Sequence, residues 1–325
     1  MTGFAYLESF MMKRLAASIL VLAPVLALAA EAPPEWAYPA APPGFQVPPG
    51  GTQPQHLPGS DKAYTEEETR DAFNPPDWYP NEHPQMPDVV AHGKNPEVSA
   101  CALCHVTMGY GHPESANITG LPAPYIEEQL HEFQNGNRAS MLPGRSNNMI
   151  RFAKNMTEDE IKQAAAYFAS IKPVVWTKVV ETDMVSKSYV GEGNMRFAET
   201  GAKEPIGRRI IELPENEERA KLRDPHSPFI AYVPTRSIKT GETLATTGDN
   251  GKTIQCSVCH GPDYKGIGNV PPLAGRSAIY LYRQMNDIQH GTRHGAAVAL
   301  MQPVVAKLSS DDMIALAAFM ASRAP

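Results

Sequence analysis

The sequence contains the stretch Cys101-Ala102-Leu103-Cys104-His105, and the same pattern returns 155 residues later as Cys256-Ser257-Val258-Cys259-His260. Two cysteines separated by two residues and followed directly by histidine are typical of c-type haem attachment. The spacing suits that chemistry, because one helical turn presents both sulfurs to the two vinyl groups of one porphyrin. The histidine then lies beneath the iron. The sequence therefore predicts two covalently bound haem c groups, with Cys101, Cys104, Cys256 and Cys259 as attachment residues and His105 and His260 as iron ligands.

Three other interpretations of the cysteines explain less of the pattern. A thioredoxin-like redox motif needs no histidine after its second cysteine, yet both copies have one. A single zinc site would join cysteine pairs 155 residues apart, far beyond the usual spacing of zinc ligands. Two disulfides would not explain why a histidine follows the second cysteine in both copies. The motifs use all four cysteines of the chain, which excludes a cysteine axial ligand and a reactive free thiol.

The repetition extends beyond the two motifs. At the same offset of 155 residues the further matches are Tyr125 with Tyr280, Gln129 with Gln284, Gln134 with Gln289, Gly136 with Gly291 and Arg138 with Arg293. The offset then falls to 152, where Asp159 matches Asp311. One unit of about 80–90 residues therefore occurs twice, as an array of two units and not as a solenoid.

This alignment separates two methionines from the others. Four methionines face Leu, Ile or Phe in the other copy, where Met acts as a flexible core filler: Met156, Met285, Met313 and Met320. Met149 instead faces Met301, and they lie 44 and 41 residues after the histidines of their motifs. Each precedes a C-terminal helix by one short loop, which can lay a thioether over the open face of the haem. We predict Met149 and Met301 as the second axial ligands, with Met141 as the alternative in the first copy.

Eight further histidines make bis-histidine ligation chemically conceivable. They are His56, His83, His92, His112, His131, His226, His290 and His294. No two of them align between the copies, so we favour surface and core roles for all eight.

Helical patterns dominate both copies of the unit. We predict helices over residues 123–135 and 278–290, and a glycine, Gly136 or Gly291, ends each of them. A helix over residues 239–246 precedes the second motif. Its counterpart before the first motif is interrupted by prolines.

Each copy also ends in a helix. Residues 157–160 (Thr-Glu-Asp-Glu) form a capping box before an apolar helical pattern, and residues 309–312 do the same more weakly. Together with the preceding helices, these segments predict a mainly α fold.

Two segments lie outside the repeat. Residues 31–90 begin with a proline-rich stretch that we expect to be extended and largely irregular. Residues 174–236 connect the copies and include two strand-like stretches, 174–180 and 209–213. We expect a small β element packed between the two haem domains. It would act either as a spacer that covers their interface or as a docking site for a partner.

The N-terminus has the three parts of an export signal. Lys13 and Arg14 precede an apolar run, residues 15–30, and Ala27-Leu28-Ala29 provides an A-x-A cleavage site. The alternative is an uncleaved membrane anchor, although the run is short for a membrane span. Export agrees with the haem motifs, because c-type haem is attached outside the cytoplasm. We therefore expect a periplasmic protein.

In its two haem motifs and the methionines that follow them, the chain resembles the class I cytochrome c family, in its dihaem, two-domain type similar to cytochrome c4. The resemblance rests on the two motifs with Met149 and Met301. In that family a proline carbonyl accepts a hydrogen bond from the haem-ligating histidine, and Pro271 or Pro272 would do so here. The first copy has Ala116-Asn117 at that place, and it lacks a glycine like Gly261 after the motif.

The resemblance implies two tandem cytochrome c domains with a proline-rich N-terminal extension and a small β-containing connecting segment. The predicted limits are residues 1–30 for the signal peptide, 31–90 for the extension, 91–173 for the first domain, 174–236 for the connecting segment and 237–325 for the second domain.

Haem iron with histidine and methionine ligands is low-spin and six-coordinate, so it has no open position for a substrate. We therefore expect an electron carrier rather than an enzyme, working between a dehydrogenase or quinol-oxidising complex and a terminal oxidase or reductase. One alternative is a dihaem peroxidase or a thiosulfate dehydrogenase, although the latter family uses a cysteine ligand that this chain lacks. Another alternative is a dedicated cytochrome subunit of a dehydrogenase complex.

The net charge of −6 argues against a nucleic-acid partner, which would need a basic face. The acidic surface favours cationic redox partners, and a peripheral association with a membrane stays open.

Overall fold

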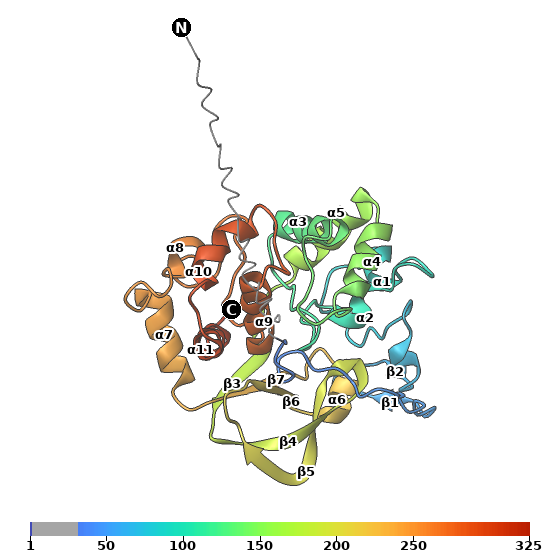
Figure 1. The fold of residues 1–325 in the computed structure, drawn as a ribbon. Coiled ribbons are helices and arrows are strands. Elements are labelled where there is room, and N and C mark those ends of the chain that lie inside the picture. Colours follow the sequence, from blue (N-terminus) through green and yellow to red (C-terminus); the bar gives the residue numbers. More distant parts are fainter. Residues whose placement is uncertain (2–31) are drawn as a thin grey trace. The chain divides into compact units, whose positions relative to one another are not determined.

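The computed structural model describes Met1 and residues 32–325. Apart from Met1, the predicted signal peptide lies outside the described residues. Among the described residues, no helix has the length and apolar character needed to cross a membrane. Helices make up 34% of the structure and strands 15%, which confirms the mainly α prediction (Figure 1).

The first copy of the repeat is a group of helices around its motif. These helices are α1 (Asp88–Ala91), α2 (Cys101–His105), α3 (Ala123–Gln134), α4 (Asn147–Asn155) and α5 (Glu158–Ser170). Helix α3 packs against both α4 and α5. The fully buried side chains of Trp78, Ile161 and Phe168 form the centre of this core. The motif itself makes up the whole of α2.

The second copy has the same plan with a longer leading helix. Its helices are α7 (Ser237–Thr247), α8 (Ser257–His260), α9 (Ala278–Gln289), η3 (Val298–Met301), α10 (Gln302–Val305) and α11 (Ser310–Ala321). Helix α11 packs on α7 and α9. The contact between α7 and α11 depends on Gly241, because a Cβ there would lie 2.0 Å from the Ala315 carbonyl oxygen. The counterpart of α7 in the first copy, α1, has only four residues.

The predicted helix ends are close to the observed ones. Gly136 and Gly291 adopt positive φ angles of 76° and 73° just beyond α3 and α9, as the predicted stop signals require. Thr157 begins α5 with a reciprocal capping box. Ser309 begins α11 in the same way, so the box expected to be weaker is formed in full.

The connecting segment contains more strand than the sequence pattern indicated. Strands β3 (Thr177–Glu181), β7 (Phe229–Val233) and β6 (Ile211–Pro214) form one sheet in that order, with β3 parallel and β6 antiparallel to β7. Strands β4 (Met184–Val190) and β5 (Arg196–Pro205) form an antiparallel hairpin. Helix α6 (Glu217–Lys221) and the short helix η2 (Glu192–Asn194) complete the segment. Only β3 and β6 were predicted.

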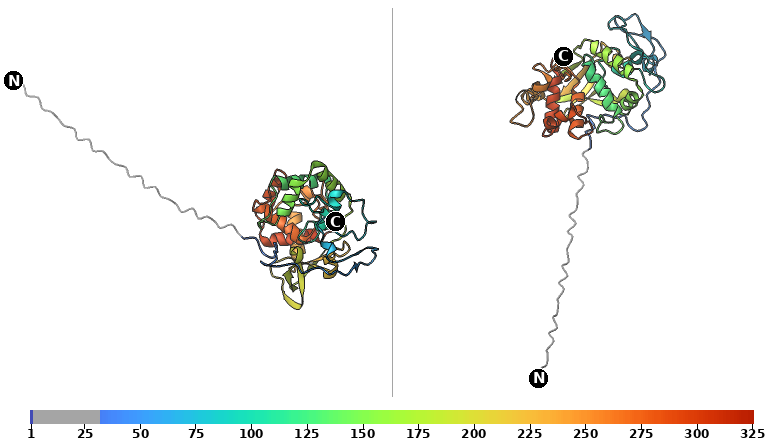
Figure 2. Two further views of the ribbon diagram at one scale, coloured as in Figure 1. Left: turned by 90° about the vertical axis from the view of Figure 1, so that its right-hand side faces the viewer. Right: turned by 90° about the horizontal axis from the view of Figure 1, so that it is seen from above.

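This β layer packs against both copies, but it does not separate them. It lies along one side of the helices in Figure 1 and in the left view of Figure 2. Helix α11 contacts β3 and β7, α9 contacts β6, and Trp176 and Phe229 join the core of the first copy. The helical copies meet directly, for example where the Arg276 guanidinium donates to the Thr119 carbonyl oxygen at 2.9 Å. The expected position between the domains is therefore wrong, because the facing polar surfaces of the copies already pair with each other.

The described part of the proline-rich extension is mostly irregular, as expected. Before α1 begins at Asp88, it forms only the two-residue strands β1 (Gln55–His56) and β2 (Ala63–Tyr64) and the short helix η1 (Glu68–Arg70). Two aromatic side chains fix it to the rest of the chain. The Tyr38 hydroxyl donates to Asp287 at 2.7 Å in the second copy, and the Trp78 indole donates to the Leu222 carbonyl at 2.8 Å.

Candidate haem-binding sites

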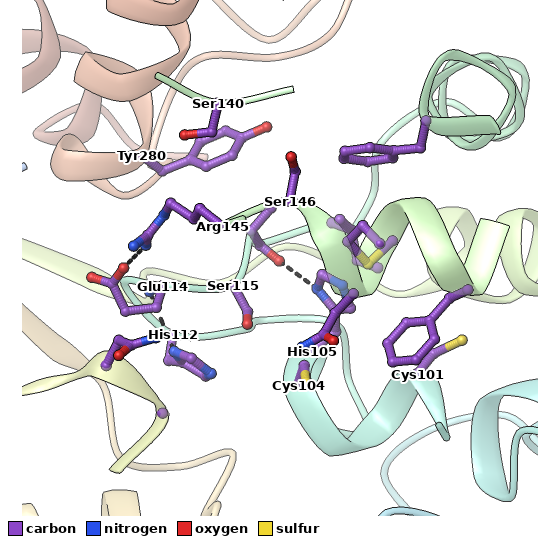
Figure 3. A pocket seen from close by; sticks show the side chains of 18 of the residues that line it. Cys101, Cys104, His105, His112, Glu114, Ser115, Ser140, Arg145, Ser146 and Tyr280 are labelled. Atoms are coloured by element: carbon purple, nitrogen blue, oxygen red, sulfur yellow. Dashed lines mark hydrogen bonds and ion pairs between the residues drawn. The ribbon is translucent and has the colours of Figure 1, made fainter. Parts of the chain in front are cut away.

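The first motif lines a cavity of about 610 Å³. Cys101, Cys104 and His105 come from α2, and Met149 comes from α4. Apolar side chains form much of the remaining wall, among them Ile126, Leu130, Phe133, Phe152 and Phe168. Figure 3 shows Cys104 below His105 and Cys101 to its right, with Arg145, Glu114 and Tyr280 on the left of the picture. A volume of this size with apolar walls suits a large flat ligand.

The histidine of each motif is oriented by a backbone carbonyl. His105 Nδ1 lies 2.8 Å from the Ala116 oxygen, and His260 Nδ1 lies 2.8 Å from the Pro271 oxygen. This contact fixes the proton on Nδ1 and leaves Nε2 free to bind a metal. Burial lowers the pKa of both imidazoles, which favours the neutral form that a metal ligand needs.

The carbonyl expected from the resemblance is therefore that of Pro271. The first copy has no proline there, yet Ala116 provides the same contact at the same distance. The acceptor is a backbone atom, so the side chain at that position does not decide the geometry. The first copy also lacks a glycine directly after its motif. Val106 nevertheless adopts a positive φ of 51° at the position where Gly261 has 82°, so the backbone turns in a similar way in both copies.

All four cysteines are free thiols in the structure, so the disulfide alternative is not formed. Burial raises the pKa of Cys101 to about 12 and that of Cys256 to about 11. Among the described residues, no group of three or more His, Cys, Asp or Glu side chains is arranged so that it could hold a metal ion.

The two candidate methionines lie on short helices and not on the predicted loops. Met149 is in the first turn of α4 and lines the cavity. Met301 ends η3 and packs against the core of the second copy. The loop prediction was wrong because residues 147–155 and 298–305 are themselves helical.

The rival Met141 points toward the other copy. Its sulfur accepts a hydrogen bond from Asn286 Nδ2 at 2.9 Å, and its backbone N–H donates to Asp287 at 2.9 Å. It packs against the core of the second copy, whereas Met149 lines the cavity of the first. The geometry therefore favours Met149 over Met141 as the axial ligand.

One of the eight further histidines, His112, also lines this cavity. Burial, followed by the positive charge of Arg223, lowers the pKa of His112 to about 3, so its ring is neutral. It belongs to the loop that also contains Ala116, the residue that orients His105. It is therefore not placed as a ligand for the opposite face of the haem.

The polar end of the cavity is a feature that the sequence analysis missed. Arg145 and Arg283 both form an ion pair with Glu114 there, and burial lowers the pKa of Arg145 to about 9. Ser140 Oγ is buried and has no hydrogen-bond partner among the described residues. Arginines and an unpaired hydroxyl suit an anionic ligand edge such as the two carboxylates of haem. The residues present therefore fit the group that the motif implies.

Comparisons with known proteins agree with this geometry. The cytochrome c family model matches residues 238–324. Cytochrome c-554(548) of Halomonas halodenitrificans is 38% identical over 80 residues, which cover 24% of this chain and 95% of that protein. The thiosulfate dehydrogenase electron acceptor of Thiomonas intermedia is 26% identical over 232 residues, 70% of this chain and 80% of the relative. Cytochrome c4 of Pseudomonas aeruginosa is 22% identical over 227 residues, 69% of this chain and 83% of the relative.

The fold and the cavity thus define a helical protein that binds haem c covalently through a C-x-x-C-H helix. The chain belongs to the cytochrome c family, and its function is electron transfer.

Proposed function

We propose that the chain is a dihaem cytochrome in which residues 91–173 and 237–325 form two domains that each hold one haem c. The equivalence of the two motif histidines supports this most directly. Each directs Nδ1 at 2.8 Å to a carbonyl eleven residues further along the chain. Two centres built in the same way can store two electrons or pass single electrons along a short path.

The proposal assigns a role to each site residue. Covalent attachment falls to Cys101, Cys104, Cys256 and Cys259, and axial ligation falls to His105, Met149, His260 and Met301. When bound, haem supplies a reversible one-electron centre. The backbone carbonyls of Ala116 and Pro271 hold the imidazoles in one tautomer, and the apolar side chains of the first cavity would exclude water from the ring face. Apolar burial and a neutral methionine ligand together favour a raised reduction potential.

We propose a thiosulfate dehydrogenase as the electron donor. Similarity to a thiosulfate dehydrogenase electron acceptor over 70% of the chain supports this choice. Oxidation of two thiosulfate ions to one tetrathionate releases two electrons, one for each proposed haem. With the export signal expected at residues 1–30, donor and acceptor would meet in the periplasm.

The haem count tests the dihaem proposal. We expect two covalently bound haems per chain by mass spectrometry of the exported protein. The double variants Cys101→Ala/Cys104→Ala and Cys256→Ala/Cys259→Ala should each lose one. A potentiometric titration with visible and near-infrared spectra should show two low-spin centres. One haem per chain, or a high-spin centre, would overturn the proposal.

Reduction by thiosulfate tests the donor and the enzyme alternative together. The oxidised protein should stay oxidised with thiosulfate alone and should be reduced rapidly after a thiosulfate dehydrogenase is added. Reduction by thiosulfate without a second enzyme would instead favour a dihaem dehydrogenase. If the added enzyme reduces the protein no faster than thiosulfate alone, the donor proposal is wrong, although the dihaem proposal stands.

A further inference from the structure

The loop that orients the motif histidine is built differently in the two copies. In the second copy it contains Pro271 and Pro272, whose rings fix the φ angles of both residues. The first copy has Ala116 and Asn117 at those places, and neither residue has such a ring. The carbonyl that accepts from His105 therefore belongs to a segment with more conformational freedom of its own.

Despite this difference, the two loops form equivalent backbone contacts. The Ile118 N–H donates to the Gly109 carbonyl at 2.8 Å, and the Leu273 N–H donates to the Tyr264 carbonyl at 2.8 Å. Both donors and both acceptors match at the offset of 155 residues. The first loop thus keeps the shape of the second loop without its prolines, and the structure contains a contact that can replace the prolines.

Arg276 of the second copy makes that contact. Its Nη1 donates to the Asn117 carbonyl at 3.1 Å and to Asn117 Oδ1 at 2.9 Å, and its Nη2 donates to the Thr119 carbonyl at 2.9 Å. Asn117 directly follows Ala116, whose carbonyl oxygen lies 2.8 Å from His105 Nδ1. A planar guanidinium that binds several acceptors at once fixes their positions relative to one another.

Arg276 is itself held firmly on the second copy. The Gly275 N–H before it donates to the Met320 carbonyl at 3.0 Å, and the Ser277 hydroxyl after it donates to Glu212 at 2.8 Å. Arg276 is only 4% exposed. Its side chain is therefore a rigid support for the loop and not a mobile surface group.

The guanidinium of Arg276 is charged, but it has no carboxylate partner. Burial lowers the pKa of Arg276 to about 10, which leaves the group protonated at neutral pH. Among the residues that the structure describes, none forms an ion pair with it, and its Nε has no hydrogen-bond partner. A buried charge without a counter-ion is costly, so the oxygens of the first loop are the groups that compensate for it. The equivalent residue of the first copy is Leu121, so this support runs in one direction only.

We propose that Arg276 is a positioning residue for the haem ligand of the other copy. It holds the Ala116 carbonyl in place and so keeps the His105 imidazole in one tautomer and one orientation. This inference rests on the proposed dihaem function. The hydrogen bond that orients a ligating histidine also sets the basicity of that ligand. The second copy therefore takes part in building the first haem site.

Solvent exchange of the two histidine Nδ1 protons tests this role. In the reduced, diamagnetic, haem-loaded chain, NMR follows both protons as they exchange with deuterium oxide, and His260 is the internal reference. Arg276→Leu introduces the residue type that the first copy has at position 121. It should accelerate exchange at His105 by about ten- to a hundredfold, because hydrogen bonds from a charged group are lost. Exchange at His260 should stay unchanged.

A second substitution should rescue the first one. Ala116→Pro introduces the proline that the second copy has at position 271, and no described residue accepts a hydrogen bond from the Ala116 N–H. In the Arg276→Leu protein this change should slow exchange at His105 again. Arg276→Lys keeps the charge but loses the planar fork, so it should accelerate exchange by a smaller factor. It provides the measurement if the leucine variant yields no haem-loaded protein.

Arg293→Gln is the matched control. Arg293 is also buried at the contact between the copies, at 7% exposure, but its guanidinium donates to residues outside the loop. Its loss should leave the ratio of the two exchange rates unchanged, although the contact between the copies is weakened.

The outcomes separate this inference from the proposed function. Unchanged exchange at His105 in both Arg276 variants would overturn the positioning role and leave the dihaem proposal intact. The same change of ratio in Arg293→Gln would show that Arg276 only joins the copies, and acceleration that Ala116→Pro does not reverse would place the effect outside the loop. Either result would also overturn the inference. A chain with one haem, or with a high-spin first haem, would overturn the proposed function instead.

Discussion

Arg138 and Arg293 occupy equivalent positions in the two copies and pair with each other as an antiparallel bridge. Each guanidinium donates to the glutamine of its own copy and to the tyrosine of the other. The four contacts are Arg138 to Gln129 at 3.0 Å, Arg138 to Tyr280 at 2.9 Å, Arg293 to Gln284 at 2.7 Å and Arg293 to Tyr125 at 3.1 Å. The residues that matched at an offset of 155 thus form a nearly two-fold symmetric network.

Removing one arginine from this network should destabilise the contact between the copies. Arg293 is 7% exposed, so Arg293→Gln would leave Tyr125 and Gln129 with lost hydrogen bonds in a buried place. We expect the free energy of unfolding to fall by about 1–3 kcal/mol. Urea unfolding of the haem-loaded protein measures this change. Arg208→Gln is the control, since Arg208 forms an exposed pair with Asp311 and should change stability much less. An equal loss for both variants would contradict a special role for the network.

The same network perturbs a tyrosine. Burial alone would raise the pKa of Tyr280, but the positive charges of Arg138, Arg293 and Arg276 outweigh burial and lower it. The effect shows how strongly the two copies interact electrostatically at this contact.

The assignment of the first methionine can be tested by substitution. Met149→Leu should remove the methionine–iron signal of one haem from the near-infrared spectrum and lower the potential of that haem by on the order of 0.1 V. Met141→Leu should leave both unchanged, because the Met141 sulfur accepts from Asn286 in the other copy. The opposite pattern would make Met141 the ligand. The second haem serves as an internal reference in both variants.

Local signals made the helices predictable, and the lack of such signals hid the sheet. Helices α3 and α9 begin and end within one residue of the predicted limits, because glycine stops are encoded within a few residues. Strand β3 instead pairs with β7, and residues Thr177 and Phe229 are opposite each other. A pairing between such distant segments leaves no local pattern, and the exposed middle of β5 lacks the alternation of a half-buried strand.

The site was predictable where side chains carry the chemistry and not where the backbone or the other copy does. The motif cysteines and histidines are explicit in the sequence. The role of the Ala116 carbonyl cannot be predicted from the sequence, because every residue has a backbone carbonyl. Arg283 reaches the first cavity from the second copy, so no spacing within one copy could reveal it. The aligned pairs Tyr125/Tyr280, Gln129/Gln284 and Arg138/Arg293 all lie at this interface, but the repeat by itself predicted only that the unit occurs twice.

Buried Glu212 should make stability depend on pH. It lies on β6 and accepts hydrogen bonds from Ser277 Oγ at 2.8 Å and from the Ile279 N–H at 3.0 Å, at the start of α9. Burial raises its pKa above the ordinary value of 4.5, although these hydrogen bonds oppose the shift. The folded state therefore binds this proton more tightly than the unfolded state. Its contribution to stability is complete below the ordinary pKa and is lost as the pH rises through the folded value.

Glu212→Gln isolates this effect. The amide keeps a carbonyl to accept from Ile279 and an N–H to donate to Ser277, but it does not ionise. Relative to the unchanged protein, the variant should gain stability steadily as the pH is raised above about 4.5. Thermal unfolding at a series of pH values measures the difference, with the exposed Glu218→Gln as control. A constant difference across pH would show that Glu212 is not the titrating group.

Gly241 should be needed for the second site, because α7 and α11 touch at its Cα. In an exposed helix, glycine to alanine would gain about 1 kcal/mol from helix propensity. Here the new methyl group would meet the Ala315 carbonyl, so we expect Gly241→Ala to lower the free energy of unfolding by about 1–3 kcal/mol. Helix α7 also accepts the Cys256 N–H through the Ala245 carbonyl at 3.0 Å. A displaced α7 should therefore alter the spectrum of the second haem and leave that of the first unchanged. Thr246→Ala, on the exposed side of the same helix, is the control. A more stable Gly241→Ala protein would contradict the close contact between the two helices.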